Sequence, residues 1–151
     1  MPLRHRSSAP TSLPARLLPV LAERVRPAPL AIGRTGIGVG MIARPRALPR
    51  AFGVDSATSA RMSWAVQMLG AREVAVGLGT LLSLRSGDRR GTRTWVAAGI
   101  VCDAVDALVI GAALARRRVA GPAGATSLVV ALAAVAGGVQ AMGEDPDAPR
   151  S

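Results

Sequence analysis

The stretch that decides the fold class is residues 124–143, which read GATSLVVALAAVAGGVQAMG. Thr126, Ser127 and Gln140 are the only polar side chains in it. A helix on the surface of a soluble bundle shows a polar stripe with a period of 3.6 residues, and this stretch has none. About twenty such residues are enough to cross the hydrocarbon core of a bilayer. The stretch therefore predicts a transmembrane helix.

The composition of the whole chain points to the same class. Half of the 151 residues are apolar, yet Phe52, Trp64 and Trp95 are the only aromatic ones. The apolar residues are mostly Ala, Val and Leu, which together with Gly allow helices to approach closely in lipid. The net charge of +10 comes from Arg residues that separate apolar runs, as juxtamembrane charges do. We therefore expect a lipid bilayer as the partner, and no nucleic acid.

Three further apolar segments precede residues 124–143 in the chain. The chain is predicted to be an all-α, four-helix transmembrane bundle with a flexible basic N-terminal tail. The tail covers residues 1–27, the membrane domain residues 28–143, and a short acidic tail residues 144–151. The expected spans are about 28–43, 62–84, 95–115 and 122–142.

The segment 28–43 is the weakest of the four. It is short for a span, which needs roughly 17–25 residues, and it contains Arg34. Gly33, Gly36 and Gly40 provide a small-residue face, with Gly36 and Gly40 in GxxxG spacing. This pattern predicts close packing against a neighbouring helix. A tilted or re-entrant segment is the alternative to a full span.

The connections between the spans suggest an orientation. Residues 85–93 (RSGDRRGTR) are predicted to be a turn, and Trp64 and Trp95 to anchor their spans at the headgroup level. With four spans, this turn and both tails share one side, which carries ten Arg residues against seven on the other. Positively charged loops stay in the cytoplasm. We therefore expect a multi-pass protein of the inner (cytoplasmic) membrane with a cytoplasmic N-terminus.

Five ionisable residues fall inside the expected spans and form a candidate charge cluster: Arg34, Arg72, Glu73, Asp103 and Asp106. All five lie near the middle of their segments, so they can share one layer. A charge at a span centre costs about 2.5–3.5 kcal/mol, whereas each Leu, Ile, Phe or Val returns only about 0.3–0.6 kcal/mol. The second and third spans each hold two charges against eight such residues. The acids therefore need arginine partners or protons.

Helical spacing places the acids on shared faces. Asp103 and Asp106 lie one above the other beside Gly99, and Glu73 lies between Gly70 and Gly77. The cluster contains two positive and three negative charges. We therefore predict that one acid carries a proton at neutral pH, most readily in the stacked pair of Asp103 and Asp106.

Two interpretations of the cluster stay open at this stage. In the first, the charges form an ion-pair latch that fixes the register of the helices in a structural or accessory membrane protein. In the second, the chain is a small transporter or proton-relay protein that uses the buried carboxylates. A partner membrane protein or a homo-oligomer is compatible with both.

The sequence offers no catalytic residues, metal ligands or cofactor site. Cys102 is the only cysteine and His5 the only histidine, which excludes an internal disulfide and argues against a His-ligated metal or haem. The glycines do not form a phosphate-binding fingerprint. An enzyme is therefore the least supported class.

Two runs carry a resemblance to known sequences: LGAREVAVGLGTL at residues 69–81 and WVAAGIVCDAVDAL at residues 95–108. With them, the chain resembles uncharacterised small four-helix integral membrane proteins of actinobacteria, which are loosely similar to the DoxX-like family. The resemblance extends over roughly residues 30–142 and implies a four-helix bundle. It implies no catalytic residue.

Overall fold

The structure is a computed structural model, and it describes residues 26–117 and 121–143. The described residues are helical without any strand, so the all-α class is confirmed. The expected number of four helices is not confirmed, because these residues form six. The helices are α2 (Pro27–Ala43), α3 (Ala47–Ala51), α4 (Ser56–Arg61), α5 (Ser63–Arg85), α6 (Arg89–Ala115) and α7 (Gly121–Gly143). The predicted basic tail, apart from its last two residues, and the predicted acidic tail lie outside the described residues.

Three of the described helices are long and apolar enough to cross a membrane, namely α5, α6 and α7. The helix α2 has 17 residues, which corresponds to about 26 Å at a rise of 1.5 Å per residue. A hydrocarbon core is about 30 Å thick. The segment that seemed weakest in the sequence is thus also the shortest of the four long helices.

The prolines of the chain explain the two short helices. Pro27 begins α2, where its missing N–H is not needed. Pro45 and Pro49 prevent one continuous helix between α2 and α5, and the connection folds into α3 and α4 instead. The carboxylate of Asp55 caps α4 by accepting hydrogen bonds from the backbone N–H groups of Ala57 and Thr58 at 3.0 and 2.9 Å.

The helix α6 begins earlier than the sequence analysis expected. Residues 85–93 were predicted to be a turn, but the turn is confined to residues 86–88, and the helix starts at Arg89. Gly87 supplies the positive φ of 68° that the turn requires. The carboxylate of Asp88 then accepts a hydrogen bond from the N–H of Gly91 at 2.8 Å. This N-cap starts the helix six residues before Trp95.

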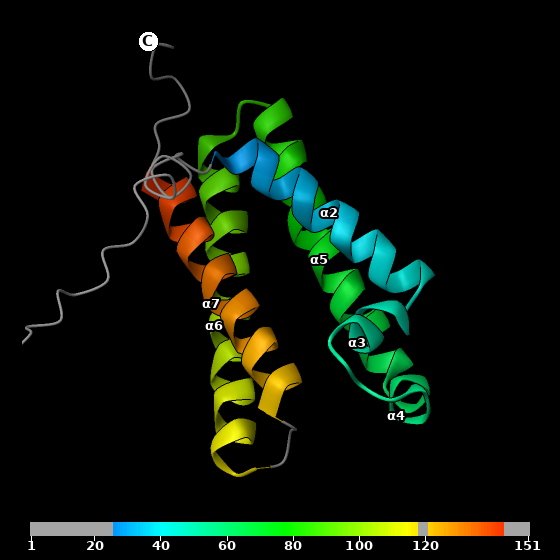
Figure 1. Cartoon of the computed structure of the whole chain (residues 1–151). Coiled ribbons are helices and arrows are strands. Elements are labelled where there is room, and N and C mark those ends of the chain that lie inside the picture. Colours follow the sequence, from blue (N-terminus) through cyan, green and yellow to red (C-terminus); the bar gives the residue numbers. More distant parts are fainter. Residues whose placement is uncertain (1–25, 118–120, 144–151) are drawn as a thin grey trace, which may run out of the picture.

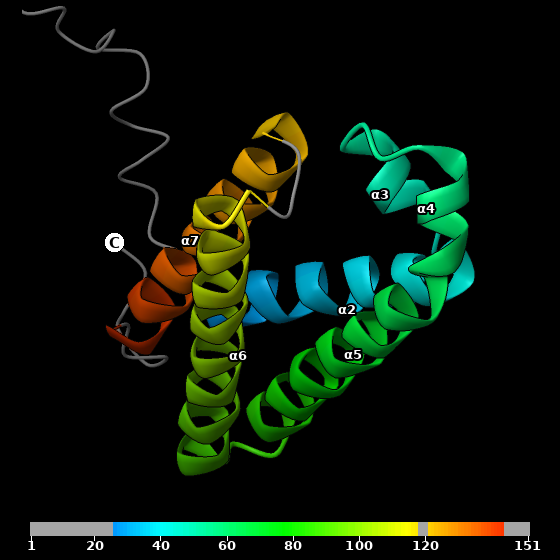
Figure 2. The ribbon, with the colours of Figure 1, turned by 90° about the horizontal axis from the view of Figure 1, so that it is seen from below.

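The long helices form two pairs, α2 with α5 and α6 with α7. The two pairs are joined because α5 also packs on α6. Figure 1 shows α2 running obliquely across α5, and α7 lying along α6. In Figures 1 and 2, α5 and α6 are close near the turn that connects them and diverge toward their other ends. The start of α2, the α5–α6 turn and the end of α7 lie at the same end of the molecule.

The packing of α2 on α5 depends on glycines, but not on those expected. Among the described residues, no atom lies within 4 Å of where a Cβ on Gly33, Gly36 or Gly40 would be, so the prediction that this face packs against a neighbouring helix is wrong for the helices described. Gly38 makes the contact instead. A Cβ on Gly38 would lie 2.6 Å from the carbonyl oxygen of Gly70, and a Cβ on Gly70 would lie 2.7 Å from that of Gly38. The packed face of α2 follows the buried residues, which are Ala31, Arg34, Gly38 and Met41.

Candidate functional site

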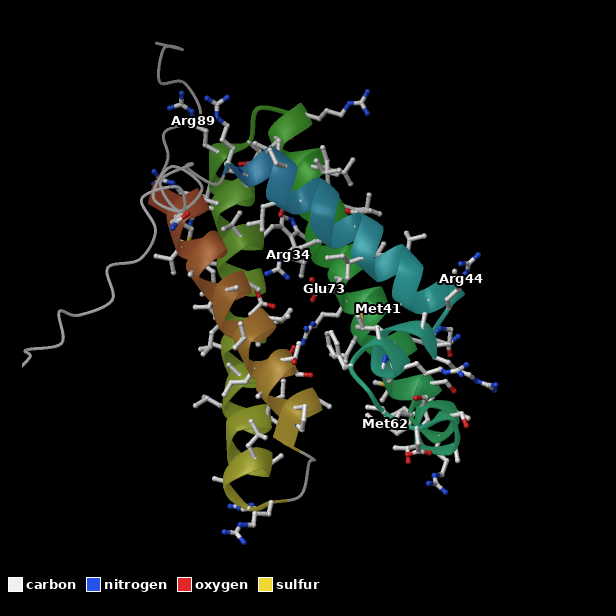
Figure 3. The ribbon with its side chains drawn as sticks, viewed as in Figure 1. Arg34, Met41, Arg44, Met62, Glu73 and Arg89 are labelled. Carbon is white, nitrogen blue, oxygen red and sulfur yellow. The ribbon has the colours of Figure 1, made fainter. Side chains whose placement is uncertain are left out.

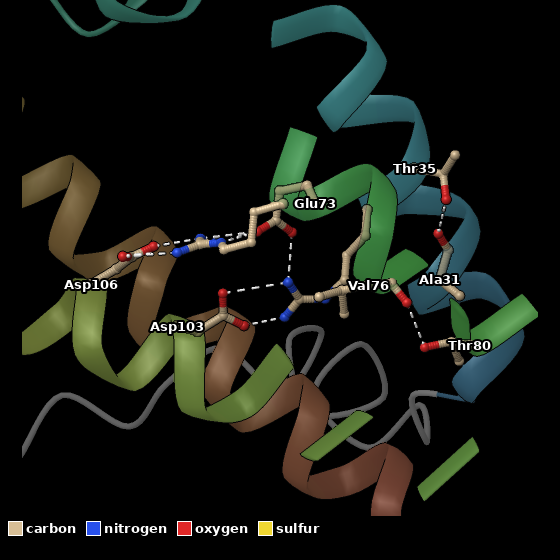
Figure 4. A network of polar contacts seen from close by, with 9 residues as sticks. Ala31, Thr35, Glu73, Val76, Thr80, Asp103 and Asp106 are labelled. Carbon is tan, nitrogen blue, oxygen red and sulfur yellow. Dashed lines mark hydrogen bonds and ion pairs between the residues drawn. The ribbon is translucent and has the colours of Figure 1, made fainter. Parts of the chain in front are cut away.

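The candidate site lies where the two helix pairs meet. α2 contributes Arg34, α5 contributes the neighbours Arg72 and Glu73, and α6 contributes Asp103 and Asp106. Figure 3 shows Arg34 and Glu73 between the pairs, about halfway along the helices. The structure brings all five residues into one network of ion pairs, which Figure 4 shows from close by.

Arg34 connects three helices through one guanidinium group. Its Nη1 donates to Oε2 of Glu73 at 2.6 Å and to Oδ1 of Asp103 at 3.4 Å. Its Nη2 donates to Oδ2 of Asp103. The planar fork of arginine fits a carboxylate with two parallel bonds, which a lysine cannot do. Arg34 therefore fixes the position of α2 relative to both α5 and α6.

Arg72 makes a second, parallel connection between α5 and α6. Its Nη1 and Nη2 donate to Oδ1 and Oδ2 of Asp106 at 3.1 and 2.6 Å. Its Nε and Nη2 also donate to Oε1 of Glu73 at 3.3 and 3.0 Å. Neighbouring residues of a helix normally point apart. Here the long arginine side chain bends back to reach the carboxylate next to it.

Glu73 joins the two halves of the network. One of its oxygens accepts from Arg34 and the other from Arg72. All six oxygens of the three carboxylates accept at least one hydrogen bond from an arginine. Among the described residues, no buried side-chain nitrogen or oxygen lacks a partner, and no three potential ligands are arranged to hold a metal ion.

The network is buried at one end and open at the other. The side chains of Arg34, Glu73 and Asp103 are 9%, 12% and 7% exposed, whereas those of Arg72 and Asp106 are 28% and 31% exposed. Asp106 lies one turn after Asp103 on α6, which brings it nearer to the end of this helix, where α5 and α6 diverge (Figure 1). The Arg34–Asp103 pair is therefore buried and the Arg72–Asp106 pair partly exposed, although both join an arginine to an aspartate.

The two aspartates of α6 do not contact each other as a pair. Asp103 and Asp106 each bind a different arginine, so the network does not pair them with each other. The shared proton expected for this pair stays a prediction. Cys102 lies one turn before Asp106 on α6 and is half-buried. It makes no disulfide among the described residues.

Sequence reasoning missed two glycines that matter for the site. Gly38 sets the distance between α2 and α5, and its signal was its place on the stripe of Ala31, Arg34 and Met41. Gly79 is the second, because a Cβ there would overlap the ring of Trp95. Trp95 thus packs on α5, while Trp64 is 65% exposed at the start of that helix. The expected role of both as headgroup anchors stays a prediction.

The sequence model of the domain of unknown function DUF4267 matches residues 31–139, which include the whole charge network. The chain belongs to this family. The DUF4267 match agrees with the resemblance to an uncharacterised family, but shows no link to DoxX-like proteins. No curated protein and no solved structure matches the chain.

Proposed function

We propose that this DUF4267 protein is a small multi-pass protein of the cytoplasmic membrane with a structural or accessory role. The charge network acts in it as a latch that holds α2, α5 and α6 in register. Three helices of suitable length and hydropathy support the membrane location. Large apolar side chains also point outward along them, such as Leu82 and Leu108, at 65% and 73% exposure. In water such a surface would aggregate, but in lipid it is solvated.

The main support for the latch is the set of hydrogen bonds that Arg34 makes. A single buried guanidinium binds carboxylates on two other helices, at residues 39 and 69 positions further along the chain. Buried ion pairs contribute little net stability, but they disfavour every arrangement that leaves one charge unpaired. In hydrocarbon this selection is strong, because no water can replace a lost partner. Such a network specifies how helices fit together.

The proposed topology places α2, α5, α6 and α7 in the membrane and both termini in the cytoplasm. The start of α2, the α5–α6 turn and the end of α7 lie at one end of the molecule, which agrees with an even number of crossings. With both tails assigned to it, that end carries ten Arg residues against seven at the other end. The positive-inside rule favours the cytoplasm for such an end.

The latch predicts a loss of stability when its open half is removed. Arg72→Leu removes the arginine that binds Asp106. It also removes one of the two arginines that bind Glu73. We expect unfolding in mild detergent to become easier by about 1–3 kcal/mol, together with a lower level of the protein in membranes. Thermal unfolding and quantitative blotting of the membrane fraction measure both effects. Arg50→Leu is the matched control, because Arg50 is exposed on α3. Equal stability of the two variants would argue against the latch.

A transport function is the second candidate, and the exposure of Arg72 and Asp106 favours it. If a water-filled opening reaches these two side chains, they can receive a proton or bind a polar solute. If the protein conducts protons in reconstituted vesicles, Asp106→Asn and Glu73→Gln should each abolish the flux. Asp88→Asn should conduct normally, because it changes a carboxylate outside the network and asparagine also caps helices. Flux that survives in both network variants would exclude the relay.

A further inference from the structure

The open half of the network presents a problem for a membrane protein. Arg72 is nine residues from the start of α5, and Asp106 is nine residues from the end of α6. At the helical rise this places them about 13–14 Å from the nearer helix end. A carboxylate cannot reach the interface from that depth. In the membrane placement proposed above, a partly exposed ion pair would therefore face hydrocarbon.

The hydrogen-bonding capacity of this pair is also incomplete. A guanidinium group has five N–H donors, and Arg72 uses four of them in the contacts described. One hydrogen on Nη1 is left over among the described contacts. Each oxygen of Asp106 accepts one bond and can accept a second. Lipid tails offer neither donors nor acceptors, so this capacity has a use only when another polar surface covers it.

We propose that a second copy of this chain covers the Arg72–Asp106 pair, so that the protein is a symmetric homodimer. The surface is self-complementary, because each copy offers both a donor and an acceptor. A twofold axis beside the pair lets Nη1 of each Arg72 donate to Asp106 of the other copy. The result is a ring of four charges with alternating sign and two hydrogen bonds between the chains. This proposal rests on the membrane location proposed above.

The surroundings of the pair fit such an interface. Met68 lies one turn before Arg72 on α5, and Val109 lies one turn after Asp106 on α6, each 64% exposed. They would form an apolar margin around the four charges. Buried polar groups inside an apolar contact select one register and one partner. Within one chain, the latch selects the register of the helices. In the dimer, the same charges would also select the register of the two chains.

The mass of the protein in lipid nanodiscs or mild detergent tests the proposal. Native mass spectrometry should show a dimer for the wild type. The double variant Arg72→Leu/Asp106→Leu removes both charges together, a change that membrane helices tolerate better than removal of one. It should be a monomer with unchanged helical circular dichroism. Leu82→Ala/Leu108→Ala is the control and should stay dimeric. A monomeric wild type, or a dimeric R72L/D106L variant, would overturn the proposal.

The natural cysteine allows a second test in native membranes, in which the wild-type chain itself is crosslinked. Cys102 lies one turn from Asp106, and it is the only cysteine in the chain. Mild oxidation should therefore give a covalent dimer through Cys102, and Cys102→Ser should abolish it. The variant Cys102→Ser/Trp64→Cys, whose single cysteine lies at the start of α5, should form less covalent dimer than the wild type. If it crosslinks more than Cys102, the interface lies elsewhere and the proposal is wrong. This outcome leaves the latch untouched, because the latch is tested by unfolding and not by mass.

Discussion

Arg34→Leu is expected to destabilise the protein more than any other single change in the network, by about 3–5 kcal/mol. The substitution leaves Glu73 with one arginine instead of two, and it leaves Asp103 with none. Both carboxylates stay in a buried position where water cannot solvate them. Much less folded protein should reach the membrane. Unfolding in mild detergent, followed by circular dichroism, measures the loss.

Three companion variants separate the latch from a general effect of arginine loss. Arg44→Leu is the control, because it removes an exposed arginine at the end of the same helix. Arg34→Lys should keep the charge but recover only part of the stability, since an ammonium group lacks the two-pronged geometry. Neutralising the acids as well, with Glu73→Gln and Asp103→Asn in the Arg34→Leu background, should restore folding in part. If R34L and R44L unfold alike, Arg34 does not hold the helices together.

Gly38→Leu is expected to have the second largest effect. A Cβ at this position would lie 2.6 Å from the carbonyl oxygen of Gly70, and backbone cannot move aside as a side chain can. The helices α2 and α5 must therefore separate, which weakens the Arg34–Glu73 contact. We expect a loss of about 3 kcal/mol or more, the upper end of the usual cost of overpacking, because the atom in the way belongs to the backbone.

The same helix offers a matched control for this change. Gly36→Leu introduces the same side chain two residues away, where nothing lies within 4 Å of a Cβ. This variant should be as stable as the wild type or slightly more so, since leucine favours helix more than glycine does. Membrane levels and thermal unfolding of the two variants provide the comparison. Equal behaviour would mean that Gly38 is not the point of contact.

Part of this architecture could be predicted because a helix that crosses a bilayer needs about twenty consecutive apolar residues, a length that is easily recognised in a sequence. Residues 124–143 identify one long helix without help from any other part of the chain. The start of α6 was predictable in principle, since Asp88 has the side chain of an N-cap and Gly87 is suited to the preceding turn. The arginines between Asp88 and Trp95 obscured it, because charged residues suggested a loop.

The grouping of the charged residues could also be derived from their equal depth. Their pairing could not. Two arginines and three acids in one layer allow several combinations, and the choice depends on the angle at which α2 crosses α5. The two helices approach closely at Gly38 and Gly70, and this contact between backbone atoms leaves no mark in a hydropathy pattern. The difference in exposure between Asp103 and Asp106 could not be derived either, because it reflects how far α5 and α6 diverge.

The order in which the partners of Arg34 appear has a consequence for biosynthesis. Asp103 follows Arg34 by 69 residues, so the ribosome makes α2 well before the acid that it binds. At 5–20 residues per second, this delay is about 3–14 s. During that time α2 is a short helix with an unpaired charge, and it is a poor candidate for insertion by itself. We therefore expect α2 to wait at the membrane surface and to enter last, after α5 and α6 have provided its carboxylates.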